Sequence, residues 1–415
     1  MPVSDEFKYL GVVFHSTKGV SAAVPTLAAA GKRAMWAMLQ RIGRLDIQSL
    51  KQKADLFEML VAPILGYCSE VWGPAVLGAA LRSDGMLDNE LQRVQLLFLR
   101  CIAGGVRKST PRRLLLREFG CRPLVRAWVR SMCELWNRAC AAGPNSWLYQ
   151  ALSENWEWRA EASHGVNMWC QQLVTVLQHF GFDSARLQQG GAFAQLDLDQ
   201  VMSAFDDWFL RGWLELPLDP RSASSHQVLY SVYDRWFAQH PMQDLQGDDR
   251  YSICPPHVQH TAGINAAHVA SLLRFRLGAH DLPVATGRWV VDPSTRQRVA
   301  RQNRSCQHCS SGSVGDEFHM VFECDFYAPV RSQFAGLFER FGGLETVHHT
   351  VTAVGDHMSQ FMSQDKRLVA AFVHACWLRR CNPGLVHDFH ELTDSDLELE
   401  SDELLQVELV ELVPD

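Results

Sequence analysis

Four residues near the C-terminus have the types and the spacing of a metal-binding set. They are Cys306, Cys309, His319 and Cys324, in the pattern C-x2-C-x9-H-x4-C. The first two thiols can turn back on one ion, and the histidine and the last cysteine can meet that ion from the opposite side. Three thiolates and one imidazole form a closed tetrahedral set, typical of structural zinc with no open position for a substrate. The pattern therefore predicts a zinc ion that stabilises the structure and does no chemistry.

The residues around this set suit a loop held by a metal ion. Gly312 and Gly315 allow the chain to turn. Phe318, Val321 and Phe322 are expected to form a small apolar floor. A floor of this size would not order the loop by itself, so removal of the metal is expected to unfold the loop locally. The alternative is that the cysteines are ordinary thiols and that the histidine lies on the surface.

A second group of possible ligands has a looser spacing. It consists of Cys376, Cys381, His387 and His390. Cys376 lies on an apolar helical run, where a packed thiol behaves as a small hydrophobic residue. We therefore expect no metal ion at this group.

The chain lacks a complete set of catalytic residues. A polymerase needs paired carboxylates that hold divalent metal ions at the site of phosphoryl transfer. Asp206 and Asp207 lie inside a helical pattern, where neighbouring side chains diverge, and Asp248–Asp249 lie in an expected loop with no strand before it. A Gly-rich phosphate loop, a nucleophile elbow and an H-E-x-x-H motif are also missing from the sequence. We expect no catalytic activity from this chain alone.

Basic side chains concentrate in two stretches. The chain has 39 Lys and Arg against 46 Asp and Glu, but ten of these acids lie in residues 391–415. Arg100–Arg138 holds ten basic residues against two acids, and Arg274–Arg304 holds seven against two. Clustered Arg and Lys bind phosphates, so both stretches are candidate contacts for a polyanion. The alternative is that they are solvated helix faces.

The candidate contacts for RNA, or for an RNA and DNA duplex, are the arginines and one lysine of these stretches. The first stretch contributes Arg107, Lys108, Arg112, Arg113 and Arg117. The second contributes Arg274, Arg276, Arg288, Arg296, Arg298, Arg301 and Arg304. Arg112 and Arg113 lie near an expected helix start, whose main-chain amides also favour phosphate. Contact through phosphates is expected to be largely independent of base sequence.

A mostly helical chain has to position these residues. Over residues 20–142, apolar residues recur three and four positions apart, which is typical of helices packed on helices. One helix is expected to be capped by Asp88 and to end at Gly104–Gly105. Another is expected to open at Thr110–Pro111, because Thr can cap a helix and Pro is tolerated in its first turn.

Helical patterns continue after residue 142. Many tryptophans lie in residues 143–216, and few basic residues accompany them, so core packing is expected for them rather than stacking on bases. Further helices are expected over Ala266–Gly278, from Pro329 and over Asp365–Cys381.

One strand is expected at the N-terminus. Residues 6–14, EFKYLGVVF, are rich in aromatic and β-branched types. A lone strand is not stable. It therefore pairs with a later part of the chain, or its partners belong to a segment that this chain lacks.

The expected fold is mostly α, a helical bundle with one N-terminal strand and a small zinc-stapled C-terminal module. We expect a strand remnant (1–15), a helical bundle (16–142), a helical tryptophan-rich region (143–216), a linker (217–225), a C-terminal region (226–390) with its zinc element (306–324) and an acidic tail (391–415). Pro and Ser indicate the linker, and charge density indicates a tail that is disordered or ordered only on a basic partner.

Composition favours an intracellular protein. No stretch approaches the roughly 20 apolar residues of a membrane helix, and the N-terminus carries acids where a signal peptide has a basic flank. The 12 cysteines are scattered along the chain and do not resemble a dense disulfide framework. Neither a membrane contact nor secretion is expected.

Several stretches, taken in order, resemble the C-terminal part of a reverse transcriptase from a LINE-type non-LTR retrotransposon. EFKYLGVVF resembles the strand that follows the catalytic palm in that family. LVAPILGYCSEVWGP has the P-x-x-x-Y-x-x-E-x-W pattern of the thumb-side helices at Pro63, Tyr67, Glu70 and Trp72. LLFLRCIAGGVRKSTPRRLLLREFGCRPL resembles the basic stretch of the family, and LRFRLGAHDLP precedes the cysteine and histidine element.

The resemblance covers residues from about 6 to 331 and implies a thumb-like bundle and a zinc element that handle nucleic acid. The fingers and palm of the family, with an aromatic-x-Asp-Asp motif, would precede Glu6. The resemblance therefore implies a fragment without the catalytic palm, whose partners include the missing polymerase half. It also implies a nuclear location, with the cytoplasm as the alternative.

Overall fold

The computed structural model describes residues 5–9, 11–81, 85–158, 168–189, 192–214, 225–247, 249–252, 255–259, 261, 263–341 and 351–382. The expected acidic tail, His387 and His390 lie outside these residues, and so does the expected linker except for Ser225. Ser225 is the first residue of a helix and does not belong to a linker. Helices dominate the described part of the chain, which confirms the predicted fold class.

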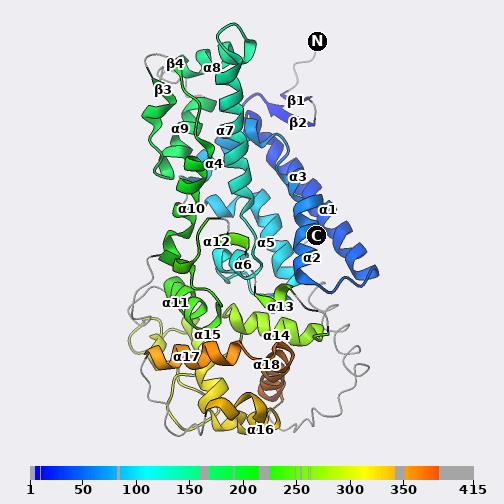
Figure 1. Ribbon diagram of the computed structural model, residues 1–415, viewed down its shortest axis with the longest axis vertical. Coiled ribbons are helices and arrows are strands. Elements are labelled where there is room, and N and C mark those ends of the chain that lie inside the picture. Colours follow the sequence, from blue (N-terminus) through cyan, green and yellow to red (C-terminus); the bar gives the residue numbers. More distant parts are fainter. Residues whose placement is uncertain are drawn as a thin grey trace.

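The first half of the chain forms a helical bundle along the long axis of the molecule (Figure 1). Its helices are α1 (Ala23–Arg44), α2 (Leu50–Leu60), α3 (Ala62–Leu65), α4 (Ser69–Leu81), α5 (Glu90–Ile102), α6 (Arg112–Glu118) and α7 (Leu124–Ala142). α4 packs against α7, and α1 packs against α5. Trp72 and Trp128 meet edge to face with 5.2 Å between their ring centroids, and both are buried. Large aromatic side chains thus fill the centre of the bundle.

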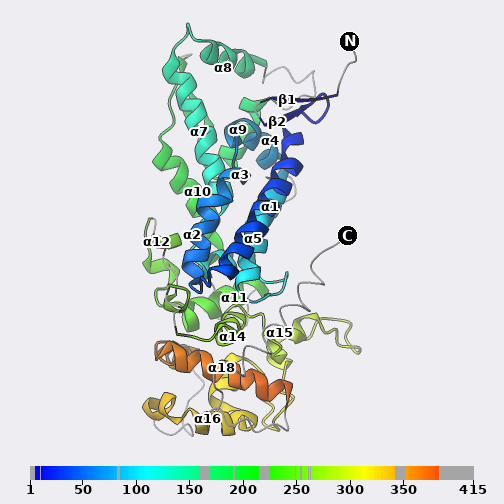
Figure 2. The same ribbon diagram turned by 90° about the vertical axis from the view of Figure 1, so that its right-hand side faces the viewer.

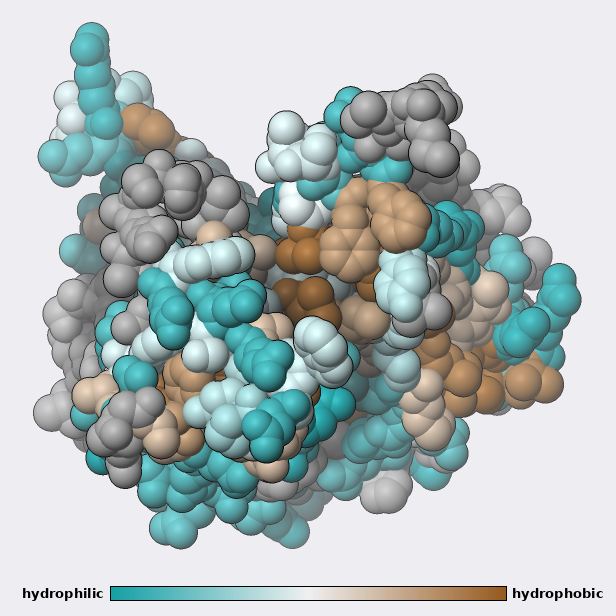
Figure 3. Space-filling model, turned by 90° about the horizontal axis from the view of Figure 1, so that it is seen from above, coloured by the Kyte–Doolittle hydropathy of each residue, from teal (hydrophilic) through white to brown (hydrophobic). Residues whose placement is uncertain are grey.

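The tryptophan-rich region extends this bundle at the end shown uppermost in Figure 1. It contains α8 (Trp147–Trp158), α9 (Trp169–His179), β3 (Gln188–Gln189), β4 (Ala192–Phe193) and α10 (Leu198–Leu214). Core packing is confirmed for Trp156 and Trp213, which are buried, but Trp147 is 88% exposed and Trp158 is 52% exposed. Seen from this end, apolar side chains gather in a depression between more polar parts (Figure 3).

The rest of the described chain forms the opposite end of the molecule (Figure 2). Its helices are α11 (Ser225–Val232), α12 (Asp249–Ser252), α13 (Pro256–Gln259), α14 (Ala266–Arg276), α15 (Pro283–Thr286), α16 (Ala328–Gln333), α17 (Val351–Met362) and α18 (Lys366–Cys381). α14 and α18 pack on each other. The expected helices at Ala266, Pro329 and Asp365 are confirmed, and the Asp365 side chain caps α18 by accepting from the Arg367 amide at 2.8 Å.

The N-terminal stretch is a hairpin, so the prediction of a single strand is wrong. β1 (Glu6–Tyr9) and β2 (Val12–His15) pair antiparallel, with Phe7 opposite Phe14. Gly11 has φ of 88°, a left-handed value that glycine adopts readily, and it allows the reversal between the strands. The strand therefore finds its partner within residues 6–15, almost entirely inside the predicted stretch.

Two of the expected helix starts are shifted. Asn89, not Asp88, caps α5, because the Asn89 side chain accepts from the Gln92 amide at 2.8 Å. α6 begins after Pro111, and the Thr110 hydroxyl caps nothing and is buried without a partner. The expected end of α5 is confirmed by the positive φ of Gly104 and Gly105.

A buried polar network joins the bundle to the opposite end of the molecule. Glu118 at the end of α6 is fully buried and accepts from Arg276 Nε at 2.8 Å and from Arg276 Nη2 at 3.1 Å. His257 Nε2 lies 2.7 Å from the same carboxylate, and the Tyr233 hydroxyl also donates to it. A buried charge needs this degree of pairing, so the network holds α6, α13 and α14 in one arrangement.

Within the described residues, none of the helices taken singly has the length and apolarity to cross a membrane. Leu50–Leu65 and Ser69–Leu81 have the required length and apolarity only when they are taken together, and the angle between them is 88°.

Candidate metal centre

A short hairpin carries the first two cysteines of the predicted set. Ser305 and Val314 form a β-bridge, and the Cys306 amide donates to the carbonyl oxygen of Ser313 at 2.8 Å. Gly312 has φ of 72°, and it lets the chain reverse. Cys306 therefore lies at the base of this turn, with Cys309 inside it.

The other two residues lie on one wide helical turn, His319–Glu323, and directly after it. The His319 amide donates to Asp316 Oδ1 at 3.0 Å, which caps the start of this turn. The Cys324 amide donates to the carbonyl oxygen of His319 at 2.8 Å, which closes its end. Both side chains are buried, so they approach the hairpin from the inside of the protein.

The four side chains meet at one point. Cys306 Sγ lies 3.8 Å from Cys324 Sγ, and Cys309 Sγ lies 3.2 Å from His319 Nε2. All four ligand atoms lie within 4.8 Å of one another. Tetrahedral Zn–S bonds of about 2.3 Å place two sulfurs about 3.8 Å apart, so the spacing matches one shared ion. The cluster predicted from the sequence therefore has the geometry to hold a metal ion.

Two neighbours orient the ligands. Glu323 Oε2 lies 2.9 Å from His319 Nδ1, which leaves Nε2 to face the cluster. The His308 amide points to Cys306 Sγ at 3.4 Å. Such partners fix the ring and raise the basicity of a metal ligand. The sequence analysis did not identify Glu323 as a partner of His319. Its position four residues after His319 could have indicated this contact, because residues at that spacing lie on the same face of a helix.

Hydrogen bonds also set the protonation of two ligands. Burial raises the pKa of Cys309, but hydrogen bonds from the Ser311 side chain and amide outweigh burial and lower the pKa to about 6. Burial opposes protonation of His319, but its bonds to Cys324 and Glu323 raise its pKa to about 11. A metal ion that binds here therefore meets a thiolate at Cys309 and displaces a proton from the imidazole.

The apolar floor under the cluster is larger than the sequence indicates. Phe318, Val321 and Phe322 are buried, as expected. Phe322, however, also meets Phe361 at 5.8 Å between ring centroids, as part of an aromatic group that reaches α17 and α18. The expectation of a small floor is wrong, because helices distant in sequence complete it. Loss of a metal ion is therefore expected to release the hairpin and to leave the helices folded.

Gly315 is a glycine that the site requires. A Cβ there would lie 2.6 Å from Pro283 Cγ and 3.1 Å from the main-chain Cα of Cys306. Gly315→Ala is therefore expected to push the hairpin off the helix before it and to destabilise the protein by about 1–3 kcal/mol. Thermal unfolding with bound metal measures this. Gly336→Ala is the control, since a Cβ at Gly336 meets nothing within 4 Å. Equal stability of the two variants would contradict the prediction.

Three candidates of the first basic stretch contact protein groups. Arg112 pairs with Asp88 at 2.6 Å. The Arg113 guanidinium lies over the Trp208 ring at 5.4 Å from its centroid. Arg117 is buried and donates to two main-chain carbonyl oxygens. These three side chains hold α6 against its neighbours.

Three candidates of the second stretch do the same. Arg274 Nε donates to the carbonyl oxygen of Gly104 at 3.0 Å. Arg276 is buried against Glu118, as described above. Arg304 donates three hydrogen bonds, at 2.7 to 3.1 Å, to the carbonyl oxygens of Val299 and Val284, and thereby ties the hairpin base to α15. No sequence pattern distinguishes these arginines from the exposed ones.

The other candidates lie nearer the surface. Lys108, Arg296 and Arg298 are exposed. Arg288 and Arg301 are half-buried, and Arg301 lies 3.8 Å from Asp316.

The two basic stretches meet in space next to the cluster. Arg107 pairs with Asp281, although their positions lie far apart in the sequence. Burial and then the positive charge of Arg107 lower the pKa of Arg288. Arg301 and Arg288 likewise act with burial to lower the pKa of Arg304. Arginines from residues 107 and 288–304 therefore lie within electrostatic reach of one another.

The remaining sequence candidates are structural in the described residues. Asp206 accepts from Arg126 Nε at 2.8 Å and from the Tyr251 hydroxyl at 2.6 Å, so it is not poised to hold a catalytic ion. Asp249 begins α12, which corrects the expected loop. Cys376 is buried on α18, and Cys381 is exposed at the end of the same helix.

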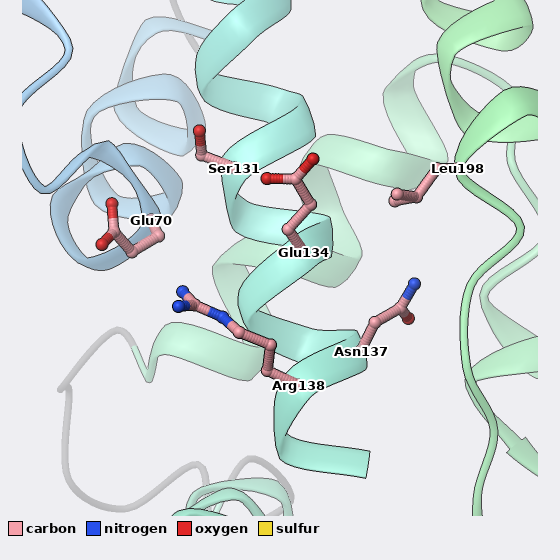
Figure 4. A pocket seen from close by; sticks show the side chains of 6 residues that line it. All are labelled: Glu70, Ser131, Glu134, Asn137, Arg138 and Leu198. Atoms are coloured by element: carbon pink, nitrogen blue, oxygen red, sulfur yellow. The ribbon is translucent and has the colours of Figure 1, made fainter. Parts of the chain in front are cut away.

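A surface hollow of about 460 Å³ lies between α4, α7 and α10. Its lining residues, drawn in Figure 4, are Glu70, Ser131, Glu134, Asn137, Arg138 and Leu198. Glu134 pairs with Arg130 at 2.9 Å, and Asn137 bonds the main chain at residue 196. Charges of both signs, one hydroxyl, one structural amide and one leucine thus line the hollow.

Comparisons of the chain with protein-family models, curated proteins and solved structures found no match.

Proposed function

We propose that this chain binds RNA, or an RNA and DNA duplex, through its phosphates, and that a structural zinc ion at the cysteine and histidine cluster supports the binding region. The role is that of a nucleic-acid-gripping part of a LINE-type reverse transcriptase without its catalytic palm, as the sequence resemblance implies. The contacts proposed are Arg107, Lys108, Arg288, Arg296, Arg298 and Arg301, here called the basic surface.

One observation carries this proposal. Arg107 lies close enough to Arg288 for its charge to lower the pKa of Arg288, although 180 residues separate them in the chain. Like charges held together cost free energy unless an anion compensates them. Asp281 and Asp316 offset part of this charge, but Lys108, Arg296 and Arg298 remain exposed beside them. A phosphate backbone is the polyanion that such an arrangement fits.

Zinc is the ion proposed for the cluster because of its ligands. Three sulfurs and one imidazole nitrogen favour zinc over the hard cations that prefer oxygen. The closed set leaves no position for a substrate, so the ion would fix the hairpin that follows the basic surface.

A second candidate function is a helical protein-interaction module with the same structural metal. The observation in its favour is that most of the twelve candidate basic residues, Arg107 and Arg301 included, already contact protein groups. Charge reversal at Arg112 or Arg113 does not separate the two functions, because Arg112 would lose Asp88 and Arg113 would lose its aromatic neighbours. Exposed members of the basic surface give the cleaner test.

Filter binding of RNA over a salt series tests the proposal. Affinity is expected to fall steeply as salt rises, because bound cations are released from the phosphates. Arg296→Glu with Arg298→Glu is expected to weaken binding at least about ten-fold and to lower the slope of log affinity against log salt by about 2. Both residues are exposed, so helicity should be unchanged.

The matched control reverses two charges elsewhere. Lys32 and Arg33 are exposed on α1, and Lys32→Glu with Arg33→Glu changes the net charge by the same amount. Equal weakening by both pairs would indicate only a general charge effect. No RNA binding by the parent chain in dilute salt would reject the proposed function.

A further inference from the structure

A second, exposed hairpin follows α15. Val291 and Arg298 form a β-bridge, and the Val299 amide donates to the carbonyl oxygen of Val290 at 3.0 Å. The Asp292 amide donates to the carbonyl oxygen of Gln297 at 2.8 Å, which closes the turn. In Figure 2 the chain after α15 projects sideways from the body of the protein. Residues 290–299 are here called the arginine hairpin.

Three consecutive apolar residues are exposed at the base of this hairpin. Trp289 is 56% exposed, Val290 is 53% exposed and Val291 is 52% exposed. The chain gains no core packing from such a run, and exposing it costs free energy. Exposed apolar groups rimmed by charge commonly mark a binding surface.

Two guanidinium groups flank the tryptophan. Arg288 Cζ lies 5.4 Å and Arg298 Cζ lies 5.5 Å from the centroid of the Trp289 ring. Arg298 is exposed on a long side chain, so it can move aside and still reach a neighbouring phosphate. The Asp292 carboxylate is occupied by the Ser294 amide and hydroxyl, at 2.8 and 2.6 Å.

Two donor atoms of the Arg288 guanidinium lack hydrogen-bond partners within the described residues. Its Nε and Nη2 atoms are buried, and neither has a hydrogen-bond partner among the described residues. Buried donors without partners are costly in a folded protein. If the Arg288 side chain turns toward the surface beside Trp289, a phosphate would satisfy them, since it offers several acceptor oxygens.

We propose that Trp289 stacks on an unpaired base of a single-stranded nucleic acid, while Arg288, Arg296 and Arg298 hold the phosphates on either side of it. This rests on the proposed function and adds a preference for unpaired nucleotides over a continuous duplex. Every base has an apolar face, so stacking on the indole is independent of sequence. In a duplex the base faces are covered by their neighbours, and Trp289 gains nothing there.

Charge favours nucleic acid over a protein partner. The hairpin and its base carry four arginines, at positions 288, 296, 298 and 301, against Asp292 alone. An anionic membrane surface also attracts tryptophan and arginine, but it does not require the buried donors of Arg288. A lipid surface is therefore an outcome that the test has to distinguish.

The test compares Trp289→Ala with Trp289→Phe on a short single strand that contains 2-aminopurine, whose fluorescence falls when it stacks. The parent chain is expected to quench the probe. Trp289→Ala is expected to weaken single-strand binding about ten-fold and to abolish the quenching, whereas Trp289→Phe retains most of both. Binding of a blunt duplex is expected to change less than about two-fold. Trp147→Ala, which removes a tryptophan that is 88% exposed on α8, is expected to change neither.

The outcomes separate this inference from the proposed function. If Trp289→Ala leaves single-strand binding unchanged while Arg296→Glu with Arg298→Glu weakens it, stacking is rejected and phosphate binding stands. Equal weakening of single-strand and duplex binding by Trp289→Ala also overturns stacking. If the parent chain binds no nucleic acid, both fail. Trp289-dependent binding to anionic phosphatidylserine vesicles without quenching of the probe assigns the hairpin to a membrane and overturns the inference.

Discussion

Purified protein is expected to carry one zinc ion per chain, and Cys306→Ser is expected to lose more than about 100-fold in zinc affinity. Even a residue that only orients a ligand is worth 10- to 100-fold, so removal of one ligand from a closed set of four costs more. Metal analysis of the purified protein measures the stoichiometry, and competition with a chelator measures the affinity. Cobalt substitution adds a thiolate absorption band that reports the three sulfurs directly.

Two substitutions at residues outside the four-ligand set are the controls for this result. The His308 ring stacks on Phe326 at 4.4 Å between centroids and is not a ligand, so His308→Asn should retain the ion. Cys381→Ser removes an exposed thiol outside the cluster and should also retain it. Retention of stoichiometric zinc by Cys306→Ser at unchanged affinity would discredit the four-ligand set.

The extent of unfolding on metal loss is a second measurable part of this prediction. Hydrogen exchange is expected to speed up in residues 305–316 when the metal is removed. α14 and α18 are expected to keep their protection, because they pack on each other and because Phe372 of α18 belongs to the aromatic group below the cluster. Loss of protection throughout the C-terminal region would show that the ion, rather than the aromatic packing, holds these helices.

Glu118→Gln is expected to destabilise the protein by about 3–5 kcal/mol, because it leaves the buried Arg276 guanidinium without a counter-charge. The substitution keeps the size of the side chain, so packing changes little. Adding Arg276→Met to Glu118→Gln is expected to recover part of the loss, since an apolar side chain needs no partner. Denaturant unfolding of the single and double variants measures this coupling.

The control removes a charge whose ion pairs are all partly exposed. Asp88 pairs with Arg93 at 2.9 Å and with Arg112 at 2.6 Å, and its side chain is 38% exposed. Asp88→Asn is expected to cost less than about 1 kcal/mol. A similar cost for Glu118→Gln would mean that the buried network does not hold the two ends of the molecule together.

The pH dependence of unfolding provides a further readout of the same network. Burial opposes ionisation of Glu118, but Arg276 and His257 outweigh it and lower the pKa of the carboxyl group. Burial and then the charge of Arg276 lower the pKa of His257. Both groups therefore bind protons more readily in the unfolded chain, so stability falls on acidification. The His257 contribution is lost as pH falls below about 6.5, and the Glu118 contribution below about 4.3.

The cysteine and histidine cluster was predictable from the sequence because its four residues are close along the chain. A loop of nineteen residues, from 306 to 324, contains all four, and the ligand types limit the chemistry to a closed tetrahedral site. Helix positions were predictable for a similar reason, since apolar spacing and glycine stops act over a few residues. α5 ends at the expected Gly104–Gly105, and α18 starts at the expected Asp365.

The errors at the N-terminus and at the helix starts arise where two local structures are both compatible with the same residues. The stretch EFKYLGVVF has the composition of one strand, but Gly11 makes a reversal possible, and pairing within the stretch needs no distant partner. Asp88 and Asn89 are both good caps, and Asn89 takes the position because its side chain reaches the Gln92 amide. Composition alone does not distinguish these alternatives.

The sequence by itself determined the helical class, the ligand set and the two basic stretches. Only the tertiary structure decided which arginines are buried with partners, such as Arg276 on Glu118, and which are exposed, such as Arg296 and Arg298. It also decided that Arg107 lies near Arg288 and that Phe361 completes the floor under Phe322. The physical reason is the distance along the chain over which each kind of interaction acts. Capping, turning and ligand spacing act between neighbours in the chain, whereas charge pairing and burial depend on contacts between segments that are distant in the chain.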